Sequence, residues 1–146
     1  MIIFTKHCKE RIKKRLLKKK SVDPCIIWSS AINFIKSSKR IESKKFIYYT
    51  DGRNTLVVTK NKIKGISREE SKRFIQDLEI DTFCVFFNNS VVKMSKKNLL
   101  KMIDLNDGNF IVSKHGDIFF GKAHVAITFR PSKRKERGWN INCLDY

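Results

Sequence analysis

The chain has 146 residues, of which 41% are hydrophobic and 32% charged, and its formal net charge is +18. This length suits one domain with a real core, and the eleven phenylalanines argue against a disordered chain. No apolar run is long enough to span a membrane and the N-terminus has no apolar signal core, so the sequence predicts a cytoplasmic protein without a membrane partner.

Positive charge is concentrated near the N-terminus. Residues 1–45 hold fourteen Lys/Arg against three acidic residues, a net charge of +11. A field of this size favours polyanions through counterion release and electrostatic steering, so nucleic acid is the expected partner. A membrane surface, an acidic protein partner and a lysine-rich face that is only solvated are the alternative interpretations.

The first predicted element is a basic helix within Thr5–Lys20. The side chain of Thr5 is suited to cap its N-terminus. Cys8, Ile12 and Leu16 recur at every fourth residue, which predicts a buried apolar stripe along this helix.

A second row follows the same spacing one position earlier. His7, Arg11 and Arg15 lie about 100° around the helix from the buried stripe. Side chains on this border are held by packing and still reach solvent, which suits a ligand that carries phosphates. Lys18 and Lys19 extend the same basic segment, and we predict that all five residues contact nucleic acid or its scissile phosphate.

The remaining elements alternate between short helices and strands. Helix starts are expected at Asp23, Ser67 and Ser95, and strands at Lys44–Thr50, Thr55–Lys60, Phe83–Phe87, Val91–Met94, Phe110–Ser113 and Ile118–Phe120. No long linker interrupts them. The sequence therefore predicts one α+β domain over residues 1–146, with an N-terminal helix pair packed on an antiparallel sheet.

The clearest strand is Ala123–Arg130. Strict alternation would place His124, Thr128 and Arg130 on one polar face, opposite an apolar face. Trp139–Leu144 is the expected partner strand of a C-terminal β-hairpin. The polar face is either the solvent side of an ordinary sheet or a functional site.

A basic arm joins the two strands of this expected hairpin. The segment Pro131–Gly138 resembles the phosphate-gripping loops of nucleic-acid binders. Its candidate phosphate contacts are Lys133, Arg134, Lys135 and Arg137, to which we add Lys114. Lys114 precedes His115, whose expected role is that of a hydrogen-bonding turn residue.

The four cysteines are Cys8, Cys25, Cys84 and Cys143, widely and irregularly separated. No CxxC pair or Cys/His cluster provides the spacing of zinc ligands, so we predict no metal site and no cofactor. Because each cysteine has apolar neighbours in sequence, we expect reduced, buried thiols.

The residue types available favour metal-free chemistry. Metal-dependent nucleases need clustered carboxylates, whereas the acidic residues here are few and scattered. Metal-free RNA cleavage needs a base, an acid and cations that stabilise the phosphorane. His7 with His124 or His115 would supply the proton-transfer pair and Arg130 a cation, which predicts a metal-independent endoribonuclease and favours RNA over DNA as the partner.

The motif at the N-terminus resembles a known family. The string F-T-K-H-C-K-E-R-I-K-K-R-L, a second helix and then F-I-Y-Y-T-D-G-R-N-T-L-V-V-T resemble the RelE superfamily of small ribonucleases. The likeness is greatest to BrnT-type toxins and phage RegB-type endoribonucleases, and it covers about residues 3–66. The resemblance implies metal-free RNA cleavage or RNA binding on the sheet face beside His7, Arg11 and Arg15. It leaves residues 67–146 as an unassigned extension.

Other functions are open on the sequence alone. The run Thr50–Lys60 resembles the strand pair of PD-(D/E)XK nucleases, but Val58 stands where that family has its second acid. One alternative is therefore a non-catalytic DNA- or RNA-binding protein, including one built on such a degenerate nuclease fold. Another is an adaptor or inhibitor that docks on an acidic protein.

Overall fold

The computed structural model describes residues 2–87, 90–105, 110–113 and 117–137. The candidate residues Lys114 and His115, the predicted strand Trp139–Leu144 and Cys143 lie outside these ranges. No helix in the described ranges is long and apolar enough to cross a membrane.

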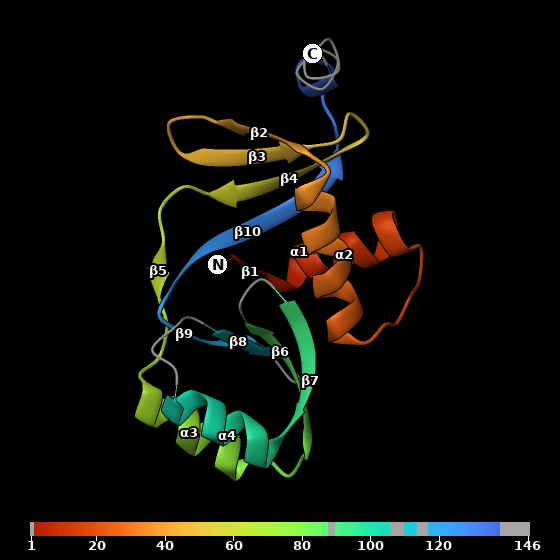
Figure 1. The fold of residues 1–146 in the computed structure, drawn as a ribbon. Coiled ribbons are helices and arrows are strands. Elements are labelled where there is room, and N and C mark those ends of the chain that lie inside the picture. Colours follow the sequence, from red (N-terminus) through yellow and green to blue (C-terminus); the bar gives the residue numbers. More distant parts are fainter. Residues whose placement is uncertain (1, 88–89, 106–109, 114–116, 138–146) are drawn as a thin grey trace.

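Within the described ranges, fifteen elements form two sheets and the helices that cover them (Figure 1). Those of the N-terminal part are β1 (Ile2–Phe4), α1 (Lys6–Ile12), the π-helix η1 (Lys13–Leu17), α2 (Pro24–Lys36), β2 (Lys39–Glu42), β3 (Phe46–Thr50), β4 (Asn54–Thr59) and β5 (Ile63–Lys64). Those that follow are α3 (Arg68–Asp77), β6 (Thr82–Phe87), β7 (Ser90–Ser95), α4 (Lys96–Leu105), β8 (Phe110–Ser113), β9 (Asp117–Phe120) and β10 (Lys122–Pro131). The fold is α+β, as the sequence predicts.

The first sheet has the strand order β1-β10-β4-β3-β2, with β5 paired to the start of β10. We expected an antiparallel sheet, but β1 runs parallel to β10 and the sheet is mixed. The expected hairpin of β3 and β4 is confirmed, and Asp51 closes its turn by accepting from the backbone N–H groups of Arg53 and Asn54, both at 2.8 Å.

β10 connects the C-terminal part of the described chain to the first sheet. It comes from the part beyond residue 66, yet it lies inside the first sheet between β1 and β4 (Figure 1). β10 pairs with β1, β4 and β5, three segments that are far from it in sequence. Residues beyond 66 are therefore an integral part of the N-terminal fold.

The second sheet has the order β7-β6-β8-β9 and is antiparallel. Alternation along β6 places Phe83 and Val85 in a core with α3 and α4, and Cys84 and Phe86 in the core around α2. Helix α2 therefore lies between the two sheets. Ser67 caps α3 as predicted, accepting from the N–H of Glu70 at 3.2 Å.

The chain leaves the first sheet after β5 and returns to it at β10, and these two connections lie side by side. Gly65 donates its N–H to the carbonyl oxygen of Gly121 at 2.7 Å, and Ile66 donates to the carbonyl of Phe119 at 3.1 Å. A Cβ atom at position 65 would lie 2.1 Å from the carbonyl oxygen of Phe119. Only glycine permits this close approach, which holds the two connections together.

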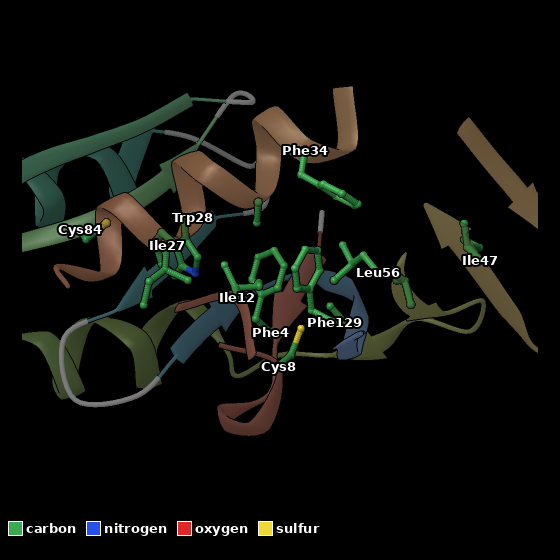
Figure 2. Packing of buried hydrophobic residues seen from close by; sticks show 13 residues of the cluster. Phe4, Cys8, Ile12, Ile27, Trp28, Phe34, Ile47, Leu56, Cys84 and Phe129 are labelled. Atoms are coloured by element: carbon green, nitrogen blue, oxygen red, sulfur yellow. The ribbon is translucent and has the colours of Figure 1, made fainter. Parts of the chain in front are cut away.

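The main core lies between the N-terminal helix pair and the first sheet (Figure 2). Cys8 and Ile12 of α1 are buried as the stripe predicts, and Leu16 is partly buried against the same core. Trp28 and Phe34 of α2 fill the space above the sheet. The predicted packing of a helix pair on a sheet is confirmed.

Two of the four cysteines are not thiols. Cys25 at the start of α2 and Cys84 in β6 form a disulfide, with their Cα atoms 5.5 Å apart. The expectation of four reduced cysteines is therefore wrong for this pair, because the fold brings together residues separated by 59 positions. The bond joins the N-terminal helix pair to the second sheet.

We expect this disulfide to stabilise the fold measurably. A cross-link that closes a loop of this length contributes about 2–4 kcal/mol, mainly by restricting the unfolded chain. The double variant Cys25→Ala/Cys84→Ala should lose that amount of unfolding free energy in urea titrations. Dithiothreitol should lower the stability of the wild type and leave the variant unchanged. An equal number of titratable thiols before and after reduction of the denatured wild type would contradict the bond.

Candidate nucleic-acid interface

The basic N-terminal helix is not one regular α-helix. It is α-helical over Lys6–Ile12, capped by Thr5, whose Oγ1 accepts from the N–H of Cys8 at 3.1 Å. It then continues as the π-helix η1, in which Lys18 donates its N–H five residues back to the carbonyl of Lys13. A π turn holds more residues than an α turn, so side chains beyond Ile12 lose the four-residue spacing.

The end of η1 redirects the chain. Lys18 has a left-handed backbone with φ of 54° and terminates the helix. The following residues, Lys19 and Lys20, are exposed, and together with Lys18 they face the same space as the side chains of α1. The segment therefore folds its lysines back beside His7 and Arg11.

These side chains line an open hollow of about 720 Å³, which we call the basic hollow. Its lining residues are His7, Glu10, Arg11, Lys13, Lys14, Lys18, Lys19 and Lys20. With histidine neutral, six cations and one carboxylate give it a formal charge of +5. The single acid, Glu10, forms a salt bridge with Lys13 at 2.7 Å. A concave surface of this charge attracts phosphate groups.

The predicted row His7, Arg11 and Arg15 is only partly brought together. His7 and Arg11 line the basic hollow, whereas Arg15 is not among the described residues that line it. The Nε atom of Arg15 is buried and has no hydrogen-bond partner among the described residues. The π-helix explains the difference, because Arg15 comes after the change of spacing.

A β-bulge interrupts β10, so side chains before and after it do not follow one continuous two-residue alternation. Ala126 pairs with Val58, and Thr128 pairs with Val57, so Ile127 is an extra residue. Ala126 and Phe129 are both buried against the helices. The two-residue alternation therefore puts His124 on the side of Ala126, and Thr128 with Arg130 on the opposite side. The predicted polar face shared by His124, Thr128 and Arg130 is wrong.

His124 is held within the sheet. Its Nδ1 atom lies 2.9 Å from the carbonyl oxygen of Thr59. Because a carbonyl only accepts, Nδ1 must carry the hydrogen of this bond. His124 is not among the described residues of the basic hollow, so the structure does not join it with His7 as a proton-transfer pair.

The arm, residues 131–137, docks on the first sheet through one carboxylate. Glu136 is 3% exposed, and Arg130 donates to its two oxygens at 2.7 and 2.8 Å. The backbone N–H of Lys133 and the hydroxyl of Thr55 also donate to it, at 2.7 and 3.0 Å. Such charge-assisted, bidentate bonds fix both partners.

A second set of bonds anchors the start of the arm. The Oγ atom of Ser132 lies 3.0 Å from each of the hydroxyls of Thr50 and Thr55. Its backbone N–H donates to the carbonyl of Arg53 at 2.8 Å. Because Thr50, Thr55 and Ser132 are all buried, these bonds are shielded from water. The predicted basic arm is therefore a docked segment rather than a free loop.

Another hollow, of about 310 Å³, lies beside the arm, and we call it the arm hollow. Arg130, Lys133 and Lys135 line it together with Tyr48 of β3 and residues of β2. Arg134 and Arg137 are exposed on the arm but are not among its described lining residues, and Thr128 is half-buried on the sheet. The predicted phosphate contacts are thus divided between the two hollows, and Arg15, Thr128, Arg134 and Arg137 are not among the described lining residues of either.

The Arg130–Glu136 pair should contribute to stability in a pH-dependent way. Burial raises the pKa of Glu136, but the bonds from Arg130, Lys133 and Thr55 outweigh it and leave the pKa below the ordinary 4.5. A lowered pKa stabilises the fold above pH 4.5, and this contribution is lost as the pH falls through the pKa of the folded state.

We therefore expect Glu136→Gln to cost about 2 kcal/mol of unfolding free energy at pH 7, as charged hydrogen bonds are lost. The difference from wild type should shrink below pH 4.5 in urea titrations. The matched control is Glu42→Gln, which removes an exposed carboxylate paired with Arg40 at 2.5 Å and should change stability little. A difference that stays constant with pH would contradict this role.

Sequence reasoning missed several residues of these sites. Glu10, Lys13, Lys14 and Lys20 line the basic hollow, and Glu136 organises the arm. The first four lie within the basic segment and could have been included on charge alone. Glu136 was missed because its burial depends on docking against the first sheet, where Thr55, 81 positions earlier, donates to it, although Arg130 and Lys133 are near in sequence.

Among the described side chains, one group of His, Cys, Asp and Glu lies close enough together to share an ion. It consists of Asp23, Cys25 and Cys84, and its two cysteines form the disulfide. Burial raises the pKa of the Cys8 thiol to about 12, so it is protonated at neutral pH and is not a nucleophile.

No protein-family model and no curated protein matches this chain.

Proposed function

We propose that this chain is a basic nucleic-acid-binding protein, with RNA favoured over DNA, and that the basic hollow is its main contact surface. The observation that carries it is the convergence of six cations from α1, η1 and the following turn on one concave surface. Phosphate contacts of this kind supply most of the affinity of nucleic-acid binders.

The arrangement supports this better than a scattered lysine-rich face would. Lys18 adopts a left-handed backbone, which is unusual for lysine, and this brings Lys18, Lys19 and Lys20 to the side of Arg11. The single acid in the hollow is neutralised by Lys13. Binding of labelled RNA and DNA of one sequence, measured by fluorescence anisotropy with EDTA present, tests the proposal. Affinity that is absent at low salt would contradict it.

A second candidate function is metal-independent RNA cleavage in the same hollow. His7 and Glu10 both line it and offer two proton-transfer groups, and Arg11 offers a cation for the phosphorane. Glu10 thus takes the place that we expected for His124. These three groups meet the chemical needs of a cyclising ribonuclease, in which the 2′-hydroxyl attacks the adjacent phosphorus and the 5′-oxygen leaves with a proton.

If cleavage occurs, we expect it to resist EDTA and to fall by at least 100-fold in His7→Ala, in keeping with the size of general acid–base effects. His124→Ala is the matched control and should keep most of the activity, since its ring is bonded to Thr59. Gel analysis of a 5′-labelled RNA measures both. Salt-sensitive binding without any cleavage would leave the binding function and remove the enzymatic one.

A further inference from the structure

The arm hollow has one apolar wall and one cationic wall. Tyr48 and Ile41 stand directly opposite each other on β3 and β2 and form the apolar wall. Arg130, Lys133 and Lys135 form the cationic wall. Its volume of about 310 Å³ is on the scale of small-ligand pockets. An aromatic ring facing cations is the combination that single-stranded nucleic acids require.

Strand register selects Tyr48 rather than its neighbour Tyr49. Tyr48 pairs with Val57 and lies on the side of the sheet that carries Thr128. Tyr49 pairs with Leu56 and packs against the core on the helix side. The ring of Phe46 lies 6.3 Å from that of Tyr48, at an angle of 57°, and supports it from the side.

The cationic wall is held in place before any ligand arrives. Glu136 accepts the backbone N–H of Lys133, and Arg137 donates its own N–H to the carbonyl of Lys133 at 3.0 Å. The arm is thus fixed on both sides of the Lys133 backbone, and its ammonium group starts from a rigid base. Preorganisation of this kind lowers the entropy lost on binding.

The two carboxylates beside the hollow are already neutralised. Glu136 is bound by Arg130, and Glu42 is bound by Arg40 at 2.5 Å and by Lys60 at 3.4 Å. They therefore oppose an incoming phosphate much less than unpaired acids would.

We propose that the arm hollow holds one unpaired nucleotide of a single-stranded nucleic acid, with its base stacked on Tyr48 and its flanking phosphates contacted by Lys133 and Lys135. This inference rests on the proposed nucleic-acid binding and narrows it to unpaired segments. A base inside a duplex is covered on both faces and cannot stack on a protein ring. The hollow therefore discriminates single strands from duplexes, which the basic hollow does not.

The test compares single-stranded and duplex ligands of one sequence. Anisotropy titrations at about 0.1 M KCl with EDTA use a labelled 12-nucleotide RNA, the same DNA sequence, and the RNA duplex. Tyr48→Ala should weaken binding of the single-stranded RNA about tenfold, which is within the range expected for the loss of one stacked base. The same variant should weaken duplex binding less than twofold. Tyr48→Phe keeps the ring and should bind like the wild type. Lys133→Ala should weaken binding of the single-stranded RNA and change duplex binding less than twofold.

Each outcome decides a different claim. A selective loss in Tyr48→Ala, with an unchanged thermal melt and rescue in Tyr48→Phe, supports the stacked nucleotide. If Tyr48→Ala loses affinity equally for single-stranded RNA and DNA, the hollow recognises the base alone. If the loss is confined to RNA, the hollow also contacts the 2′-hydroxyl. Wild-type affinity in Tyr48→Ala overturns the inference and leaves the proposed function intact. A wild type that binds none of the three ligands overturns both.

Discussion

Replacing Lys18, Lys19 and Lys20 together by alanine is expected to weaken RNA binding by roughly 10- to 100-fold at 0.1 M salt. All three line the basic hollow, and each phosphate contact to a single strand contributes about 0.7 to the slope of log K against log salt. The slope should therefore fall by about 2 in the triple variant. Fluorescence anisotropy over a series of KCl concentrations measures both quantities.

The matched control removes the same charge elsewhere. Lys62, Lys97 and Lys101 are exposed and lie outside both hollows. Their triple alanine variant has the same net charge as the first and should lose less than threefold in affinity. Equal losses in the two variants would mean that total charge, and not the hollow, governs binding.

Phe129→Ala is expected to have the largest effect on stability, about 3–5 kcal/mol of unfolding free energy. Phe129 is 1% exposed in the middle of β10, and its ring meets that of Phe34 edge-on at 5.0 Å (Figure 2). Removing it leaves a cavity between α2 and the first sheet. Urea unfolding followed by far-UV circular dichroism gives the free energy.

An exposed phenylalanine provides the comparison. Phe74 lies on α3 and is 46% exposed, so Phe74→Ala should cost less than about 1 kcal/mol. A small effect in Phe129→Ala would contradict the position of β10 inside the first sheet, between β1 and β4. Through this position, β10 near the end of the described chain pairs with β1 at its beginning.

Local patterns predicted most helices and strands, since caps and periodicity are encoded within a few residues. Asp23 followed by Pro24 marks the start of α2, and Ser67 caps α3, as expected. The short strands β1 and β2 were missed, because three or four residues are too few to show a period. Strand order was beyond local reasoning, as the pairing of β10 with β1 depends on contacts more than 120 positions apart.

Only part of each candidate site was predicted, because local periodicity holds in some segments and fails in others. His7 and Arg11 were identified from helical spacing, which holds up to Ile12 and fails in η1. His124 and Arg130 were assigned to one face by alternation, which fails at the bulge beside Ile127. A π-helix and a bulge each insert residues without a sequence signature that a single chain reveals.

The most direct test of nucleic-acid binding by the basic hollow is the salt dependence of RNA affinity in the unmodified protein. With EDTA present and KCl varied from low to physiological concentration, log K should fall linearly with log salt. The slope should lie between about −2 and −4, as expected when three to six cations contact phosphates. A slope near zero, or no binding at low salt, would contradict the account.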